Sequence, residues 1–369
     1  QVIEYIEDLH FDPEDIDYLR STGIFKEDFL EYLADFKFTG DIYAVPEGTV
    51  VFPREPLVKV IAPIMQAQLV ETALLNIINH QSLIATKTSR IVHAAGGDGV
   101  MEFGLRRAQG PDAGIYGARA AMIAGCIGTS NVLCGQMFDV PVKGTHAHSW
   151  IMSFPDELTA FRTYAKLYPS ACILLVDTYD TLKSGIPHAI QVFKEMREAG
   201  IPLTFYGIRM DSGDLAYLSK EAKKMLDAEG FTDAVISASN DLDEGLISSL
   251  KNQGAAINSW GVGTNLITSK DCPSFGGVYK LAAIKDKATG KFIPKIKLSE
   301  NEEKITNPGN KTIYRIYSRD SHKIIADLIC LVGETYDENN SLLLFDPVAT
   351  WKKTLLAPGT YTMKEIMVP

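Results

Sequence analysis

The sequence has few cysteines and no long apolar run, and both shortages exclude classes of protein. None of the five cysteines belongs to a C-x-x-C pair, which argues against a disulfide framework or a structural zinc site. No apolar segment reaches the roughly 18 to 20 residues of a membrane span. The opening QVIEYIEDLHF is acidic, whereas a signal peptide would begin with basic residues. We therefore expect a cytoplasmic protein with reduced thiols and no membrane partner.

Basic charge is also in short supply. The 369 residues contain 36 Lys and Arg against 46 Asp and Glu, a formal net charge of −10. Because no basic excess is available to pair with a phosphate backbone, we expect no nucleic-acid partner. Any phosphate ligand must be held by a local cluster of side chains. The hydrophobic content of 46% allows a large core, shared by one large domain and a smaller one.

Residues 99–265 repeat one unit, a short apolar run followed by an amphipathic helix. The runs are GVMEF, VPVKGTHAHS, ACILLVDTY, LTFYGIRMD, AVISASN and INSWGVG, and clear helical patterns cover residues 157–168, 188–200, 215–230 and 242–254. Six such units predict an α/β fold with a parallel sheet that closes as an irregular βα barrel.

The two ends of the chain have a different pattern. We expect two short helices before Phe38, short antiparallel strands in residues 38–63 and a long helix over residues 65–95. Four further β-rich segments, residues 276–286, 291–299, 311–318 and 322–331, follow the barrel. Residues 1–98 and 266–369 are therefore predicted to form a smaller, discontinuous, β-rich domain around a catalytic barrel of residues 99–265.

Chemically active side chains gather after the six apolar runs. In parallel α/β folds, functional residues lie at the carboxyl ends of the strands. Those ends carry Glu102, Arg106 and Arg107; Gly144, Thr145, His146, His148 and Ser149; Asp177 and Asp180; Arg209, Asp211, Ser212 and Asp214; Ser237, Ser239, Asn240 and Asp241; and Gly261, Gly263 and Thr264. This composition is typical of an active-site rim.

Each of these groups also has a structural interpretation. Arg106 and Arg107 can bind phosphates or a carboxylate, or can be solvated surface residues. The glycines of WGVGTN can bring a backbone close to phosphate, or can supply the positive φ of a tight turn. Asp177 and Asp211 can hold Mg²⁺, accept ribose hydroxyl bonds or orient an imidazole. Asp180 and Asp214 can serve instead as helix N-caps.

His146 and His148, in GTHAHSW, are two residues apart and would point the same way on a strand. The pair can be a metal clamp, a catalytic histidine with a neighbour, or packing. A metal clamp needs further ligands, and the other histidines are poorly placed to supply them: His10, His80, His93, His188 and His322.

Taken together, the motifs resemble one family. EFGLRRAQGPDAG, GTSNVL, GTHAHSW, LLVDTYDTL, GIRMDSGDLAYLSK and WGVGTN, preceded by FTGDIYAVPEGTVVFP, are similar to nicotinate phosphoribosyltransferases of the bacterial type, which have the type II phosphoribosyltransferase fold. The resemblance implies that nicotinate and 5-phosphoribosyl 1-pyrophosphate become nicotinate mononucleotide and pyrophosphate. It also implies ATP as co-substrate, coupled through a phosphohistidine, and Mg²⁺ as cofactor.

The resemblance also implies roles for single residues. His148 would carry the phosphoryl group with Asp177 as its partner, Asp211 would contact ribose or Mg²⁺, and Arg209 would contact the pyridine ring or its carboxylate. Asp177 and Asp180 are further Mg²⁺ candidates. The remaining substrate contacts would be Arg106, Arg107, Gly144, Thr145, Ser149, Ser212, Ser239, Asn240, Gly261, Gly263 and Thr264. A homodimer with active sites at the subunit interface is expected, with a ring-stacking aromatic before residue 1.

Three alternatives remain open on the sequence. A nicotinamide phosphoribosyltransferase would share the fold and the ATP coupling but recognise an amide. A metal-dependent barrel hydrolase would use His146 and His148 as ligands. A non-catalytic phosphate-sugar binding protein would bind the pyrophosphate substrate without turnover.

Overall fold

A computed structural model describes residues 1–298 and 307–369, which divide into two compact units. The central unit is Ile78–Gly276, and the terminal unit combines Gln1–Ile77 with Gly277–Pro369. The boundaries expected from the sequence, 98/99 and 265/266, lie inside the central unit. The difference arises because Ile84, Ile91 and Leu266 are buried in the core of the central unit. Among the described residues, no helix is long and apolar enough to cross a membrane.

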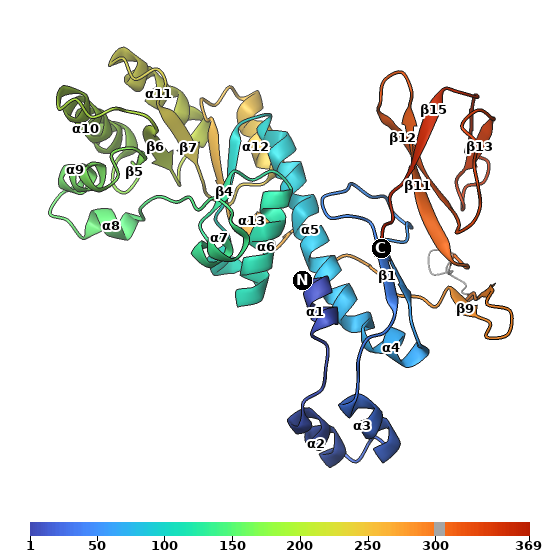
Figure 1. The fold of residues 1–369 in the computed structure, drawn as a ribbon. Coiled ribbons are helices and arrows are strands. Elements are labelled where there is room, and N and C mark those ends of the chain that lie inside the picture. The colour runs from blue at the N-terminus through green and yellow to red at the C-terminus, as the bar shows by residue number, and fades with distance from the viewer. Residues whose placement is uncertain (299–306) are drawn as a thin grey trace. The chain divides into compact units, whose positions relative to one another are not determined.

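The central unit is built on one curled sheet of six parallel strands (Figure 1). The strands are β3 (Gly99–Glu102), β4 (Gly128–Thr129), β5 (Cys172–Leu175), β6 (Tyr206–Met210), β7 (Val235–Ala238) and β8 (Ser259–Val262). Their order is β4-β3-β8-β7-β6-β5, and every neighbouring pair is parallel. The expected α/β class is confirmed, and the sheet curls into a half-barrel. It does not close fully, because β4 and β5 lie at its edges and do not pair with each other.

Helices follow the strands as the repeated pattern predicts. They are η1 (Leu105–Arg107), α6 (Pro111–Ile123), α7 (Val132–Phe138), α8 (His148–Met152), α9 (Glu157–Leu167), η2 (Thr181–Gly185), α10 (Ile186–Glu198), α11 (Leu215–Ala228), α12 (Glu244–Asn252) and α13 (Thr264–Ile267). The four helices with clear sequence patterns are α9, α10, α11 and α12. An aspartate side chain at the N-cap accepts a backbone hydrogen bond in α9, α11 and α12, which fixes where these helices begin.

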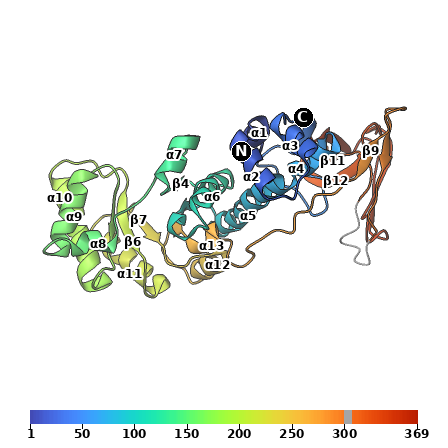
Figure 2. The same cartoon turned by 90° about the horizontal axis from the view of Figure 1, so that it is seen from below.

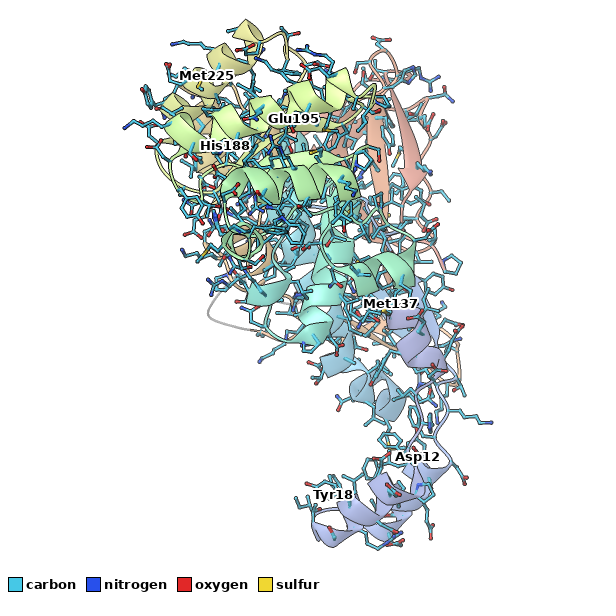
Figure 3. The ribbon with its side chains drawn as sticks, turned by 90° about the vertical axis from the view of Figure 1, so that its left-hand side faces the viewer. Asp12, Tyr18, Met137, His188, Glu195 and Met225 are labelled. Atoms are coloured by element: carbon cyan, nitrogen blue, oxygen red, sulfur yellow. The ribbon has the colours of Figure 1, made fainter. Side chains whose placement is uncertain are left out.

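The core of the central unit lies between the sheet and its helices. All four residues of β5 are buried, as expected for a parallel strand that is covered by helices. Side chains of α9 and α10 add polar contacts between these helices: His188 Nδ1 lies 2.9 Å from Glu157 Oε2, and Arg162 Nη2 lies 2.6 Å from Glu195 Oε1. His188 and Glu195, both on α10, are labelled in Figure 3.

The strand expected over residues 140–149 is wrong. The second strand of the sheet is Gly128–Thr129, and Val142 forms only an isolated parallel bridge to Thr129. Residue 148 is the first residue of α8. The period of two that would place both histidines on one face therefore does not apply to them.

The terminal unit combines short helices with small antiparallel sheets. Its helices are α1 (Val2–Glu7), α2 (Pro13–Ser21), α3 (Glu27–Ala34) and α4 (Ile64–Leu69), and α5 (Glu71–Ala95) begins there. The expected pair of helices corresponds to α2 and α3, which lie side by side (Figure 1 and Figure 2). The long helix expected over residues 65–95 is interrupted at Val70, and α1 was not predicted.

The sheets of the terminal unit bring both chain ends together. β1 (Asp41–Ala44) pairs with β2 (Val58–Ile61), β9 (Ala283–Lys285) with β10 (Phe292–Pro294), and β13 (Leu342–Phe345) with β14 (Lys353–Leu356). β11 (Lys311–Ser318) lies between β12 (Ile324–Leu331) and β15 (Tyr361–Glu365). An antiparallel bridge joins Ala44 to Val368. The expected β-rich assembly from both ends is confirmed; residue 299 of the expected segment 291–299 lies outside the described residues.

Candidate active site

The carboxyl ends of the parallel strands surround a cavity of about 540 Å³ in the central unit. Its lining is Phe103, Arg106, Arg107, Ser130, Gly144, Thr145, Ala147, His148, Leu175, Arg209, Asp211, Ser239, Asn240, Asp241, Gly261, Gly263 and Thr264. The expectation that side chains after different strands meet at one rim is therefore met by the geometry.

Most of the predicted substrate contacts line this cavity, but several of the predicted residues do not. The Asp177 side chain is buried outside the lining, and Ser212 donates a hydrogen bond of 2.6 Å to it. Ser149 lies in α8, outside the lining. Asp180 accepts a hydrogen bond of 2.9 Å from Lys183 N. This contact fits a helix N-cap better than it fits a metal ligand. Asp214 likewise caps α11 through Tyr217 N.

Four lining residues were not among the candidates from the sequence. Phe103 directly follows β3, so inspecting strand ends for aromatic as well as polar residues would have found it. Ser130 follows β4, the strand that the sequence pattern did not reveal. Ala147 and Leu175 carry no chemical signal of their own, and only the structure places them in the lining.

Arg209 is held in one orientation by three side chains. Its Nε donates to Ser239 Oγ at 3.0 Å, its Nη1 to Thr145 Oγ1 at 2.6 Å and its Nη2 to Asp211 Oδ1 at 3.2 Å. Ser239 also donates a hydrogen bond to Asp211 Oδ1. The guanidinium lies 5.8 Å from the ring centre of Phe103. A fixed cation beside an aromatic face therefore forms one wall of the cavity.

His148 begins α8 and faces two carboxylates. Its Nε2 lies 3.9 Å from both Asp177 Oδ1 and Asp211 Oδ2, and its Nδ1 lies 3.0 Å from Thr178 Oγ1. The Asp177 side chain is only 2% exposed, and its Oδ2 accepts bonds from Asp211 N and Ser212 Oγ. Its buried Oδ1 has no hydrogen-bond partner among the described residues. An anchored carboxylate oxygen is therefore available on the imidazole side.

His146 lies in a different environment. It is 8% exposed, packs edge-on against Tyr164 with ring centres 4.6 Å apart, and its Nε2 accepts a hydrogen bond of 3.2 Å from Leu175 N. Burial lowers the pKa of His146 to about 4, so the ring is neutral at pH 7. Because Nε2 accepts a bond, the single proton lies on Nδ1. The two histidines contact different residues and do not form a shared clamp.

The possible metal ligands were also inspected as groups. Within residues 1–298 and 307–369, no cluster of three or more His, Cys, Asp or Glu side chains is arranged to hold a metal ion. A site at the cavity would therefore need oxygen ligands from a substrate in addition to those of Asp177 and Asp211.

The two glycines after β8 are required by close packing. A Cβ atom at Gly261 would lie 2.7 Å from the Phe103 ring, and one at Gly263 would lie 3.1 Å from Phe103 O. Neither glycine has a positive φ, so the tight-turn interpretation of WGVGTN is not the reason for them. They allow the ends of β3 and β8 to approach each other at the cavity.

Glu102 joins the two strands next to the arginine pair. It is fully buried, accepts a hydrogen bond from Gly104 N, and accepts one of 2.6 Å from Thr129 Oγ1. Burial raises the pKa of its carboxyl group. Arg106 and Arg107 follow in η1, where both are exposed and line the cavity. Their guanidinium donors are thus available to an anionic ligand. The turn that carries them is attached to β4 through Glu102.

The chain is similar to one family along nearly its whole length. The profile described as the nicotinate phosphoribosyltransferase family matches residues 99–318, and the profiles of its N-terminal and C-terminal domains match residues 1–79 and 310–369. Nicotinate phosphoribosyltransferase of Bacillus subtilis is 51% identical over 351 residues, covering 95% of this chain and 70% of that protein. A Mycobacterium tuberculosis relative of the same description is 42% identical over 347 residues, covering 94% and 70%.

Solved structures support the same comparison. The crystal structure of human nicotinic acid phosphoribosyltransferase has a TM-score of 0.82 at 28% identity and covers 99% of this chain and 79% of that chain. A nicotinate-nucleotide pyrophosphorylase from Pyrococcus furiosus has a TM-score of 0.68 at 23% identity, covers 93% and 77%, and shares the fold.

Proposed function

The chain belongs to the nicotinate phosphoribosyltransferase family, and we propose that it joins nicotinate to 5-phosphoribosyl 1-pyrophosphate. The products would be nicotinate mononucleotide and pyrophosphate, so the reaction feeds NAD synthesis from nicotinate. We further propose that ATP hydrolysis is coupled to this reaction through a phosphorylated His148.

One observation carries the proposal: Arg209 is fixed beside Phe103 in the cavity that also presents Arg106, Arg107 and His148. Nicotinate is a flat aromatic ring with a carboxylate, so an aromatic face next to a guanidinium suits it. The arginine pair offers forked donors to the phosphates of the sugar substrate. This arrangement favours the acid over nicotinamide, because an uncharged amide forms no ion pair with Arg209.

The chemistry of glycosyl transfer fits a site of this kind. The ring nitrogen of nicotinate forms a bond to C1 of the ribose while the bond from C1 to the pyrophosphate oxygen breaks. Positive charge develops on the sugar, and negative charge on the leaving group. The contribution of the protein is to anchor both phosphate ends and hold the ring in line. The hydroxyls and carboxylate around Arg209 keep its cation in place throughout.

We propose that His148 exchanges a phosphoryl group. The lone pair of one ring nitrogen would attack the γ-phosphorus of ATP, the bond from that phosphorus to the ADP oxygen would break, and ADP would leave. Water would later attack the same phosphorus, the phosphorus–nitrogen bond would break, and phosphate would leave. Whether the other ring nitrogen keeps its proton depends on the group that is hydrogen-bonded to it. Thr178 contacts Nδ1, and the Asp177 and Asp211 carboxylates face Nε2 and stabilise positive charge on the ring.

Mg²⁺ is the cofactor that these residues would suit. Asp177 has a buried carboxylate oxygen without a hydrogen-bond partner in the described structure, and the Asp211 carboxylate lines the cavity. Mg²⁺ in phosphate-transferring sites is held by one or two carboxylates together with substrate phosphates, so the donor set fits. When bound, the ion would neutralise charge on the pyrophosphate. We propose Asp177 and Asp211 as its ligands.

Two further features of the proposal concern the assembly and the compartment. We propose a homodimer with active sites at the subunit interface; light scattering on the purified full-length protein would test the dimer. All five cysteines are free thiols, which supports a reducing, cytoplasmic location.

The decisive experiment is to incubate the full-length protein with γ-labelled ATP. We expect an acid-labile label on the wild type that is absent in His148→Ala and present in His146→Gln, whose amide oxygen can still accept a bond from Leu175 N. Label that survives the loss of His148 would contradict the phosphohistidine. Product formation with nicotinate and with nicotinamide then tests the substrate, and preference for the amide would contradict the role of Arg209.

A further inference from the structure

Two loops that line the cavity are joined by a side chain that does not line it. The loop after β7 contains Asn240 and Asp241, and the segment after β8 contains Gly263 and Thr264; all four line the cavity. Asn240 has φ of 95° and Asp241 has φ of 43°. Few non-glycine residues adopt this left-handed region, so the surrounding contacts must hold the loop in this shape.

Asn265 supplies such contacts. Its side chain is buried, the residue being 7% exposed, and Nδ2 donates hydrogen bonds to Asp241 O at 2.7 Å and to Leu242 O at 3.1 Å. Leu242 is 1% exposed and belongs to the core of the central unit. One primary amide therefore ties the left-handed loop after β7 to the segment that directly follows Thr264.

We infer that Asn265 is a positioning residue for the phosphorylated sugar substrate, an inference that rests on the proposed function. It acts through Asn240 and Asp241, whose backbone it fixes next to Gly263 and Thr264. The amide group matters because two carbonyl oxygens face it and both need a donor. An aspartate at this position would offer oxygen atoms to both carbonyl oxygens and would repel them.

A matched pair of variants tests this role. Asn258 directly precedes β8 and, unlike Asn265, is exposed; its Oδ1 accepts a bond of 3.0 Å from Ile236 N. Asn265→Ala and Asn258→Ala thus remove the same group, the first from α13 after β8 and the second directly before β8. For Asn265→Ala we expect KM for 5-phosphoribosyl 1-pyrophosphate to rise about tenfold, as the loss of a buried hydrogen-bonded group allows. Its kcat and its KM for nicotinate should change less than about threefold, and all three constants of Asn258→Ala less than about twofold.

The outcomes separate this inference from the proposed function. Equal KM values for the sugar substrate in the two variants, or an equal loss in every constant of Asn265→Ala, would overturn the role of Asn265. If that variant does not fold, Asn265→Asp decides, because it keeps the volume and should raise the same KM at least as far. A wild type without turnover would contradict the proposed function. The affinities of the two variants for 5-phosphoribosyl 1-pyrophosphate could then still be compared by calorimetry. Equal affinities would overturn the inference, and so would a wild type that does not bind this substrate.

Discussion

His146 and His148 illustrate how environment decides the chemistry of a residue type. Both are histidines in one heptapeptide, yet one ring is 8% exposed and the other side chain is 39% exposed. The buried ring accepts a bond from Leu175 N at the edge strand of the sheet, which would otherwise leave that donor unpaired. The exposed ring faces Asp177 and Asp211. Their spacing in the sequence does not distinguish the two histidines, whereas their burial in the structure does.

The pKa of His146 predicts a pH dependence of stability. The pKa is lowered to about 4 by burial from an ordinary value of 6.5, so between these values the unfolded state binds more protons. The free energy of unfolding should therefore rise with pH across this window. The contribution of His146 to it should be complete above pH 6.5. Between pH 7 and pH 5 we expect a loss on the order of 1–2 kcal/mol from this residue.

Urea unfolding of the wild type and of His146→Gln at pH 5 and pH 7 measures this contribution as a difference. The wild type should lose more stability than the variant on acidification, while the titration of other groups cancels. Equal losses in the two proteins would show that the His146 ring does not stay neutral in the fold.

At the scale of elements, the sequence predicted long periodic segments and missed short ones. The patterns for α9 to α12 extend over several helical turns, and an aspartate at the N-cap marks three of these helices. β4 has two residues and α8 has five, too few for a period to be recognised. The alternating residues around Val142 are typical of a strand, but they form a single bridge. Tertiary pairing overrode the local pattern there.

The same limit applies to the candidate site. The rule that function gathers at strand ends identified the arginines, acids, glycines and hydroxyls of the rim, because those residue types carry chemistry. It did not distinguish Asp177, whose side chain is buried outside the lining, from Asp211, which lines the cavity. It also said nothing about Asn265, since an amide that binds only backbone has no recognisable pattern. Such roles follow from three-dimensional packing alone.

A buried lysine joins two helices and a connecting segment of the central unit, and its contacts predict a stability effect. Lys87, in α5, is 5% exposed, and its Nζ lies 2.7 Å from both Glu244 Oε2 in α12 and Asp271 Oδ1 after α13. Lys87→Met would leave two carboxylates without their cation. Both carboxylates are partly exposed, so we expect a loss of about 1–3 kcal/mol in the free energy of unfolding, measured in urea.

The matched control is Lys183→Met, the same change at a lysine whose side chain is 88% exposed and whose Nζ lies 3.9 Å from Asp180 Oδ2. We expect this control to change stability by less than about 0.5 kcal/mol. If both variants lose equal stability, the Lys87 contacts do not stabilise the folded state.

At the scale of the whole molecule, the reactivity of the buried cysteines can be used to follow the unfolding of each unit separately. Cys126, Cys134 and Cys172 are buried in the central unit, and Cys330 is buried in the terminal unit. Burial raises the pKa of Cys126 and of Cys172 to about 12 and that of Cys134 to about 11, so very little thiolate forms in the folded protein. Cys272 is the one exposed thiol.

We therefore expect one rapidly reacting thiol in the native protein and five in denaturant, and Cys272→Ser should remove the rapid reaction. Pulse labelling across a urea series, with the labelled peptides identified by mass spectrometry, should show Cys126 and Cys172 becoming reactive together, because both belong to one hydrophobic core. Cys330 should follow its own transition, set by the stability of the terminal unit. Labelling of Cys126 and Cys172 over separate urea ranges would mean that the central unit does not open as one cooperative body.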